Sequence, residues 1–129
     1  MATSSRIRIA TSPTDGFFVN ETVSFTSSAG DNASFRGPGT YPWLLQTLRA
    51  FNGEGAARDM RFLLTDSDGV EHAVLSMSDV SPVSVPSGDV LVWNGNVIVP
   101  PTWRIYAKWY SMAGGASCNW QYTAVELSP

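Results

Sequence analysis

The sequence predicts an all-β protein built as an antiparallel β-sandwich, of either jelly-roll or immunoglobulin-like type. Short segments in which apolar and polar residues alternate recur along the chain, and a period of two is typical of half-buried strands. Clusters of glycine, proline, asparagine and aspartate separate these segments, as turns between strands do. With 129 residues and no internal repeat or linker, the chain is expected to form a single domain over residues 1–129.

The composition indicates a folded chain with an unusual surface. Hydrophobic residues make up 43% of the sequence, which excludes an intrinsically disordered polymer. Charged residues make up only 15%, against about 25% in an average domain. A protein that stays free in solution normally carries more lysine and glutamate. We therefore expect other molecules to cover much of this surface.

The net charge and the lack of long apolar segments argue against several kinds of partner. The net charge of −3 argues against a protein that binds nucleic acid by neutralising phosphates. No apolar run approaches the roughly 18 residues of a membrane helix, and the first residues lack the apolar stretch of a signal peptide. We therefore expect neither nucleic acid nor a membrane as a partner. The single cysteine, Cys118, excludes an internal disulfide bond and supplies too few thiols for a structural zinc site.

The alternating segments give the order of the predicted strands. In the second of them, Phe17, Val19, Val23 and Phe25 share one face. Glycine-containing turns at 66–69 and 94–96 each join two strands as a hairpin. A proline-flanked segment around Val83 and Val85 suits an edge strand or a crossing loop. The other predicted strands cover residues 6–9, 17–25, 60–65, 70–77, 89–93, 97–99, 102–110 and 119–127.

One short helix is expected near residues 42–51. Leucines 44, 45 and 48 and Phe51 are spaced as on one face of a helix. Pro42 suits a first helical turn, and Asn52 with Gly53 suits a left-handed stop. The alternative is a strand that begins with a proline.

An extended loop is expected at residues 26–40. This segment holds one large apolar residue, Phe35, among small, polar and breaker residues. Loops of this length are uncommon in compact domains and often serve a function. We interpret it as an arm or binding loop with Phe35 as an anchor; the alternative is a plain surface loop.

The sequence contains no complete catalytic or ligand-binding motif. His72 is the only histidine, and a histidine in a strand is usually structural. The sequence contains no Gly-x-Ser-x-Gly elbow and no phosphate-binding loop with its lysine. Asp66-x-Asp68-Gly69 resembles the opening of a calcium loop, but the later ligands of such a loop are missing. We expect no enzymatic activity, no cofactor and no metal.

Aromatic residues and arginines give the strongest functional signal. The basic residues are seven arginines and one lysine, and interfaces are enriched in arginine, tyrosine and tryptophan. In the strand at 102–110, Trp103, Ile105, Ala107 and Trp109 share one face. Two alternatives remain open for the opposite face of this strand, since it is either an interface or part of a core covered on both sides. The candidate interface residues are Phe35, Arg36, Arg104, Tyr106, Lys108 and Tyr110.

The C-terminal third of the sequence resembles a known class of proteins. Residues 91–107, LVWNGNVIVPPTWRIYA, precede a Gly/Ala-rich turn and a last strand that ends Val125-Glu126-Leu127. This succession is similar to the closing hairpins of small all-β virion proteins of tailed bacteriophages. The resemblance implies a non-enzymatic subunit present in many copies, made in the host bacterial cytoplasm and incorporated into the virion.

These observations lead to a ranked expectation for function. We expect a capsid decoration or cementing protein whose partners are its own copies and other virion proteins, such as the major capsid protein or head–tail proteins. A neck or tail component is one alternative. Another is a carbohydrate-binding or receptor-recognition module, because sugar rings stack on exposed aromatic side chains while Asn and Asp bind hydroxyls.

Overall fold

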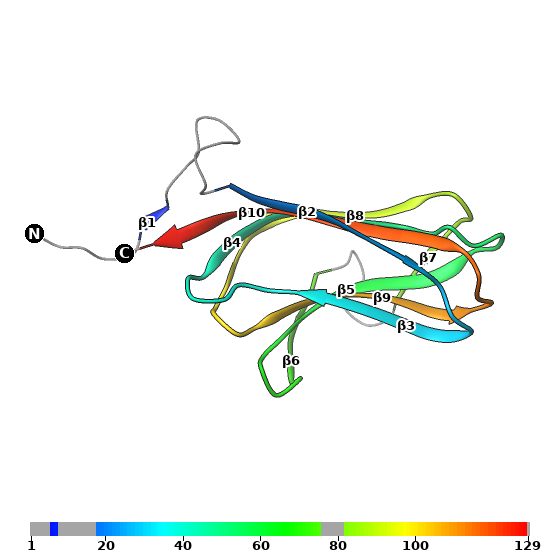
Figure 1. Cartoon of the computed structure of the whole chain (residues 1–129), viewed down its shortest axis with the longest axis horizontal. Helices are drawn as coiled ribbons and strands as arrows, with labels where there is room; N and C mark the ends of the chain where they lie inside the picture. The colour runs from blue at the N-terminus through cyan, green and yellow to red at the C-terminus, as the bar shows by residue number, and fades with distance from the viewer. Residues whose placement is uncertain (1–5, 8–17, 76–81, 129) are drawn as a thin grey trace, which may run out of the picture.

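The computed structural model describes residues 6–7, 18–75 and 82–128, and within these ranges it is an antiparallel β-sandwich (Figure 1). The sandwich and the all-β class are as predicted. Two sheets form the two layers that Figure 1 shows one above the other. The strands are β1 (Arg6–Ile7), β2 (Phe18–Thr26), β3 (Gly30–Arg36), β4 (Trp43–Phe51), β5 (Arg58–Thr65), β6 (Glu71–Val74), β7 (Val83–Val85), β8 (Val90–Val99), β9 (Arg104–Met112) and β10 (Ser117–Ser128).

The strand pairing identifies the sandwich as a jelly roll. In the first sheet β10 lies between β2 and β4, β8 pairs with the far side of β4, and β1 pairs with the end of β10. In the second sheet β9 lies between β3 and β5, and β6 and β7 both pair with β5. The pairs are nested, since β2 pairs with β10, β3 with β9, β4 with β8 and β5 with β6 and β7. A long hairpin rolled up in this way gives the double-sheet jelly roll.

The core lies between the two sheets and is rich in large aromatic side chains. Trp109 and Trp120 are completely buried, and the ring of Phe25 meets that of Trp109 edge-on at a centroid distance of 4.8 Å. The predicted inward faces are confirmed, because Val19, Val23 and Phe25 pack against the core. On β9, the inward residues Ile105, Ala107 and Trp109 are buried. The structure shows no helix among the described residues, and so none long and apolar enough to cross a bilayer.

The helix expected near residues 42–51 is wrong, and the alternative strand is correct. This segment is β4, which pairs with β10 on one side and β8 on the other. The register shifts next to Gln46 in both pairings, so a β-bulge interrupts the alternation of side chains. Leu45 and Leu48 are therefore both buried although they stand three positions apart. This spacing imitates one face of a helix.

The extended loop expected at 26–40 is also wrong, because β3 occupies its middle and pairs with β9. β3 is an edge strand, so its small and polar residues meet solvent. The turn before it depends on Asn32, whose Oδ1 accepts hydrogen bonds from the N–H and the hydroxyl of Ser28 at 3.0 and 3.2 Å. The Nδ2 of Asn32 donates to the Ser28 carbonyl at 2.9 Å. A compact turn therefore replaces the start of the expected loop.

Of the two predicted hairpins, one is confirmed and one is not. β5 and β6 pair across the turn at 66–69, where Gly69 has a φ of 84°. Residues 94–96 lie inside the continuous strand β8, at a register shift against β4, and form a bulge instead of a turn. Residues 8–9, 17 and 76–77 of the predicted strands lie outside the described residues.

Gly53, which follows β4, is required by a close approach of backbone. A Cβ atom there would overlap the carbonyl oxygen of Ser117, at the start of β10. At Gly55 the space for a Cβ atom is open, so this position is a matched control.

We expect Gly53→Ala to lower the free energy of unfolding by about 1–3 kcal/mol, because the two backbone segments must move apart. Gly55→Ala should change it by less than about 0.5 kcal/mol. Urea unfolding followed by tryptophan fluorescence measures both. Equal stability of the two variants would contradict the close contact.

Candidate interaction surface

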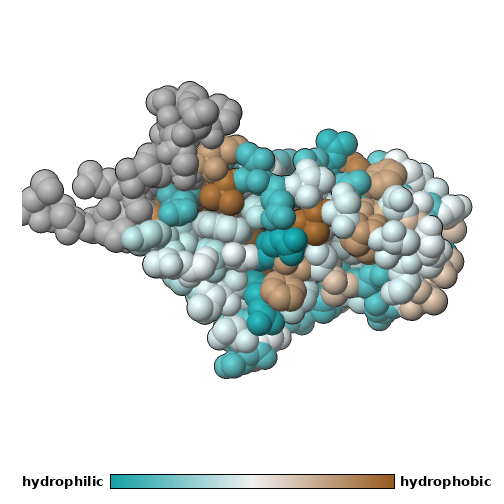
Figure 2. Space-filling view, viewed as in Figure 1, coloured by the Kyte–Doolittle hydropathy of each residue, from teal (hydrophilic) through white to brown (hydrophobic). Residues whose placement is uncertain are grey.

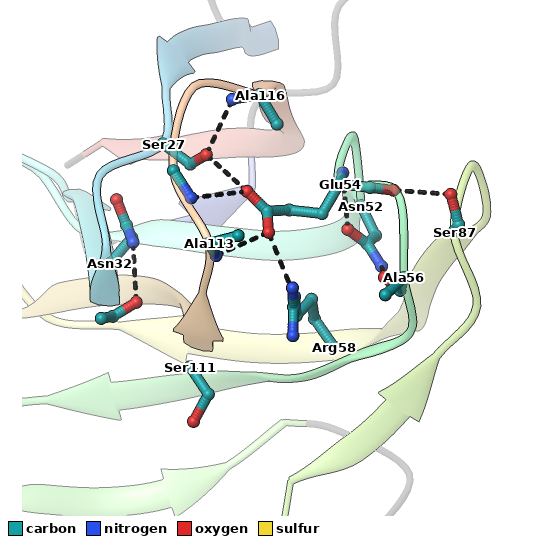
Figure 3. A network of polar contacts seen from close by, with 12 residues as sticks. Ser27, Asn32, Asn52, Glu54, Ala56, Arg58, Ser87, Ser111, Ala113 and Ala116 are labelled. Atoms are coloured by element: carbon teal, nitrogen blue, oxygen red, sulfur yellow. Dashed lines mark hydrogen bonds and ion pairs between the residues drawn. The ribbon is translucent and has the colours of Figure 1, made fainter.

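The buried carboxylate of Glu54 forms a polar network with four donors (Figure 3). The N–H of Ala113 donates to Oε1 at 2.7 Å, and the N–H of Gly114 donates to Oε2 at 3.1 Å. The Ser27 hydroxyl donates to Oε2 at 2.8 Å, and Nε of Arg58 donates to Oε1 at 3.1 Å. Only 2% of the Glu54 side chain is exposed. Both carboxylate oxygens are thus held by donors of the protein itself.

This network joins the loops at one end of the sandwich. Ser27 follows β2, Glu54 precedes β5, and Ala113 and Gly114 connect β9 to β10. Asn52 extends the network, since its Oδ1 accepts from the N–H of Glu54 at 2.9 Å and its Nδ2 donates to the Val85 carbonyl at 2.9 Å. The Ser87 hydroxyl donates to the Glu54 carbonyl, which adds the turn before β8.

The surroundings of Glu54 keep it ionised and therefore structural. The N–H of Ala113 is the largest influence, and together with Ser27, Gly114 and Arg58 it lowers the pKa of Glu54 from 4.5 to about 2, although burial acts in the opposite direction. A carboxylate with so low a pKa is a poor general acid or base near neutral pH. Its role is to satisfy the buried donors of the loops.

The other residues considered for chemistry have structural surroundings too. Nε2 of His72 lies 2.9 Å from Oδ2 of Asp66, and the His72 ring stacks on that of Trp103. Oδ1 of Asp66 accepts from the N–H groups of Asp68 and Val70, so it stabilises the turn. Within residues 18–75 and 82–128 no group of three metal-ligating side chains comes together. Cys118 is buried, which raises the pKa of its thiol.

The outer face of the second sheet carries an aromatic and cationic surface. On β9, Arg104, Tyr106, Lys108 and Tyr110 alternate with buried residues, as the sequence predicted. These four side chains are only partly buried, so the outer face of β9 remains accessible to solvent. We define the aromatic–cation surface as Phe35, Arg61, Arg104, Tyr106, Lys108 and Tyr110.

Strand register places these side chains in contact. Phe35 on β3 lies opposite Tyr106, and their ring centroids are 5.2 Å apart. Cζ of Arg104 lies 4.6 Å from the centroid of the Phe35 ring, and Nζ of Lys108 lies 5.4 Å from that of Tyr106. Phe35 remains 43% exposed. The aromatic rings and cations thus support one another while they face outward.

Arg61 is a member of this surface that the sequence analysis missed. It lies on β5 opposite Lys108, and its Nε donates to the Tyr110 hydroxyl at 2.8 Å. The alternation of Met60, Phe62 and Leu64 places Arg61 on an outer face, but only the tertiary pairing of β5 with β9 brings it beside Tyr110. A cation–π contact at 5.8 Å accompanies the hydrogen bond.

Arg36, the remaining residue of the predicted interface, lies outside the aromatic–cation surface. It follows Phe35 on β3 and therefore belongs to the other face of the strand. Its Nε lies 3.0 Å from Oε1 of Glu21 on β2, so the pair links the two sheets along one side of the sandwich. Seen from the side of β2 and β3, hydrophilic residues form a band across both layers between apolar residues (Figure 2).

The charge on the aromatic–cation surface is positive although the whole chain is acidic. Arg61 has a carboxylate partner, Glu71, at 3.5 Å. Arg104 and Lys108 form no ion pair with any described residue. Two cations therefore remain available for a partner that carries carboxylates or backbone carbonyls.

Comparison with known proteins gives similarity of fold. No protein-family model and no curated protein matches the sequence. The crystal structure of the SPBc2 prophage-derived protein YomS is 13% identical over 81% of this chain and 95% of that chain, with a TM-score of 0.49. A structure of the T13 viral particle of infectious bursal disease virus is 11% identical, with a TM-score of 0.39, and a structure of its Gx strain is 11% identical, with a TM-score of 0.35. This chain covers 36% and 37% of those two viral chains. At these identities the likeness concerns the arrangement of strands.

The low pKa of Glu54 predicts how stability depends on pH. Because the pKa in the folded state is about 2 and the usual value is 4.5, the ionised carboxylate stabilises the fold above pH 4.5. This contribution is lost as the pH falls from 4.5 through about 2.

We therefore expect Glu54→Gln to lower the melting temperature at pH 7 and to reduce the loss of stability between pH 4.5 and 2. Asp59→Asn, at an exposed carboxylate of β5, is the control and should keep the wild-type dependence. Thermal melts at a series of pH values measure both. A Glu54→Gln variant that follows the wild-type profile would show that another group is responsible.

Proposed function

We propose that this protein is a non-enzymatic structural subunit of a bacteriophage virion, and that it is a capsid decoration or cementing protein. Its partners are the major capsid protein and its own copies, and its final location is the virion. The observation that carries the proposal is the aromatic–cation surface, which docks on the shell.

The chemistry of this surface supports a protein partner. Tyrosine and phenylalanine offer large rigid contact areas and lose little conformational freedom on binding, and arginine adds a planar guanidinium that binds carboxylates through two hydrogen bonds. Phe35, Arg104 and Tyr106 already hold one another in place before any partner arrives. The charges of Arg104 and Lys108, which form no ion pair within the described part of the chain, suit an acidic or carbonyl-rich shell surface.

The fold supports the same role. The Glu54 network fixes the loops at one end, so the sandwich can act as a rigid body between neighbours. The low content of charged residues, 15%, fits a surface that is covered in the assembled particle. The resemblance of residues 91–107 and 125–127 to the closing hairpins of tailed-phage virion proteins points the same way.

A depression on the outer face of the first sheet favours a second candidate function, carbohydrate binding. It has a volume of about 370 Å³ and is lined by Arg49, Phe51, Val90, Asn119 and Gln121. An aromatic ring beside amide and guanidinium groups can stack on a sugar and bind its hydroxyls. This site lies on the sheet opposite the aromatic–cation surface, so the two functions can be separated by mutation.

If the aromatic–cation surface binds the shell, a protein variant with a substitution in this surface should be incorporated into particles in smaller amounts. In particles purified on a density gradient from cells that carry the complete genome, the wild-type protein is expected at a fixed ratio to the shell protein. Tyr106→Ala should reduce this ratio at least about tenfold, because loss of a central aromatic anchor costs about 2 kcal/mol, or about thirtyfold in affinity. Thr22→Ala, an exposed residue of the other sheet, is the control and should leave the ratio unchanged.

The outcomes distinguish the candidates. Absence of the wild-type protein from particles would overturn the proposed function, and a fixed ratio to tail protein alone would place it in the tail. Normal incorporation of Tyr106→Ala would show that another surface docks. Binding of the purified protein to a glycan array, lost on Phe51→Ala with an unchanged melting temperature, would favour the carbohydrate-binding function.

A further inference from the structure

β8 is an edge strand whose outer side has no partner among the described strands. It pairs with β4 only and ends the first sheet. Along such an edge, the N–H and C=O groups of alternate residues point away from the sheet and can pair with another strand. β8 is ten residues long, from Val90 to Val99, and contains no charged residue.

The other edge strands carry features that prevent such pairing. β2 contains Glu21, β3 contains Asp31, and β6 contains Glu71. β7 has only three residues and lies between two prolines. Charges, short length and proline are the usual protection of a sheet edge. Among the described edges, β8 is the long one without a charge or a proline.

The side chains of β8 are apolar at both ends of the strand and amides in the middle. On the outer face Val92 is 41% and Ile98 is 51% exposed. Asn94 and Asn96 are exposed between them, and Gly95 lies in the bulge. The Trp93 ring lies over Gly95, so a Cβ atom at this position would meet it at 2.6 Å.

We infer that β8 pairs antiparallel with β8 of a second copy of this chain, about a two-fold axis at Gly95. The first sheet of one copy and the first sheet of the other then form one continuous sheet across the boundary between the two subunits. In this register Val92 faces Ile98 of the second copy, and Asn94 faces Asn96 of the second copy. On the other face of the strand, Trp93 lies beside Val97 of the second copy.

The sequence of β8 favours its own copy as the occupant. A two-fold axis brings the same patch of both copies together, so the patch must complement itself. About Gly95, apolar residues meet apolar residues and amides meet amides. Moving the axis to Asn94 would place Val92 opposite Asn96 and lose this match. An uncharged edge also brings no like charges together across the axis, which would be destabilising in neighbouring strands.

The bulge is compatible with this arrangement. Gly95 and Asn96 both lie opposite Gln46 of β4, so the bulge includes the proposed axis and the two irregular segments face each other. The regular parts of β8 on both sides of the bulge remain available for hydrogen bonds. The aromatic–cation surface lies on the second sheet and stays free. The inference rests on the proposed function for its biological meaning, because subunits of a particle meet their own copies at high local concentration.

Analytical ultracentrifugation of the purified protein over a range of concentrations tests the inference. The wild type is expected to form a reversible dimer, and Val92→Lys should raise its dissociation constant at least about tenfold. Val70→Lys is the matched control, since Val70 is 55% exposed at a turn and away from β8, and it should dimerise as the wild type does. Circular dichroism checks that each variant is folded.

A charge exchange tests the register. Val92→Lys combined with Ile98→Glu should restore dimerisation, because each lysine then faces a glutamate of the second copy. Val92→Lys combined with Ile98→Lys should abolish it.

Three results would overturn the inference. The first is a wild-type protein that stays monomeric up to millimolar concentration. The second is a wild-type dimer whose dissociation constant Val92→Lys leaves unchanged. The third is a monomeric protein whose incorporation into particles falls on Val92→Lys, because β8 would then bind the shell protein. A monomeric wild type that still enters particles through Tyr106 would leave the proposed function intact. A β8-dependent dimer that is absent from particles would support the inference and contradict the proposed function.

Discussion

The arrangement of this sandwich depends on one buried carboxylate. The Glu54 carboxylate accepts hydrogen bonds from Ser27, from the loop that holds Ala113 and Gly114, and from Arg58, and the Ser27 donor is buried together with it. An unsatisfied buried donor costs on the order of 1–3 kcal/mol, so the loops and the carboxylate need each other. The close approach of Gly53 to Ser117 belongs to the same constraint, because it brings the end of β4 against the start of β10. The strands of both sheets begin or end at these loops, so their positions at this end are fixed together.

The fold class could be predicted because period-two alternation survives in most strands. The alternation breaks in β4, where the bulge beside Gln46 places Leu45 and Leu48 on one face. It fails again in β3, where an edge strand made of small and polar residues has no apolar alternation to detect. In β8, Asn94-Gly95-Asn96 has the composition of a hairpin turn but forms a bulge, since pairing with β4 continues on both sides. Bulges and edges are properties of the assembled sheet, so local sequence does not report them.

The candidate surface was predictable where it depends on one strand alone. Alternation in β9 separates Tyr106 from Ala107 correctly, and with it the outer face from the core. Arg36 and Phe35 could share one surface only in a loop, because neighbouring residues of a strand point to opposite faces. The roles of Arg61 and Glu54 could not be predicted from the sequence for another reason. Their partners, Tyr110 and Ala113, are far along the chain and meet them only through the nested pairing of strands.

The nested pairing also determines the order in which the chain can become native. The pairing of β2 with β10 starts at Thr26 and Ser117, so most of the chain must be enclosed before it forms, whereas β5 and β6 meet across a short turn. Folds dominated by such distant pairings cross a high entropic barrier and fold over milliseconds to seconds. During that interval the uncharged β8 can meet the β8 of another nascent chain before the rest of the subunit exists. The rate of synthesis and the temperature of expression should therefore govern how much of the protein reaches its native form.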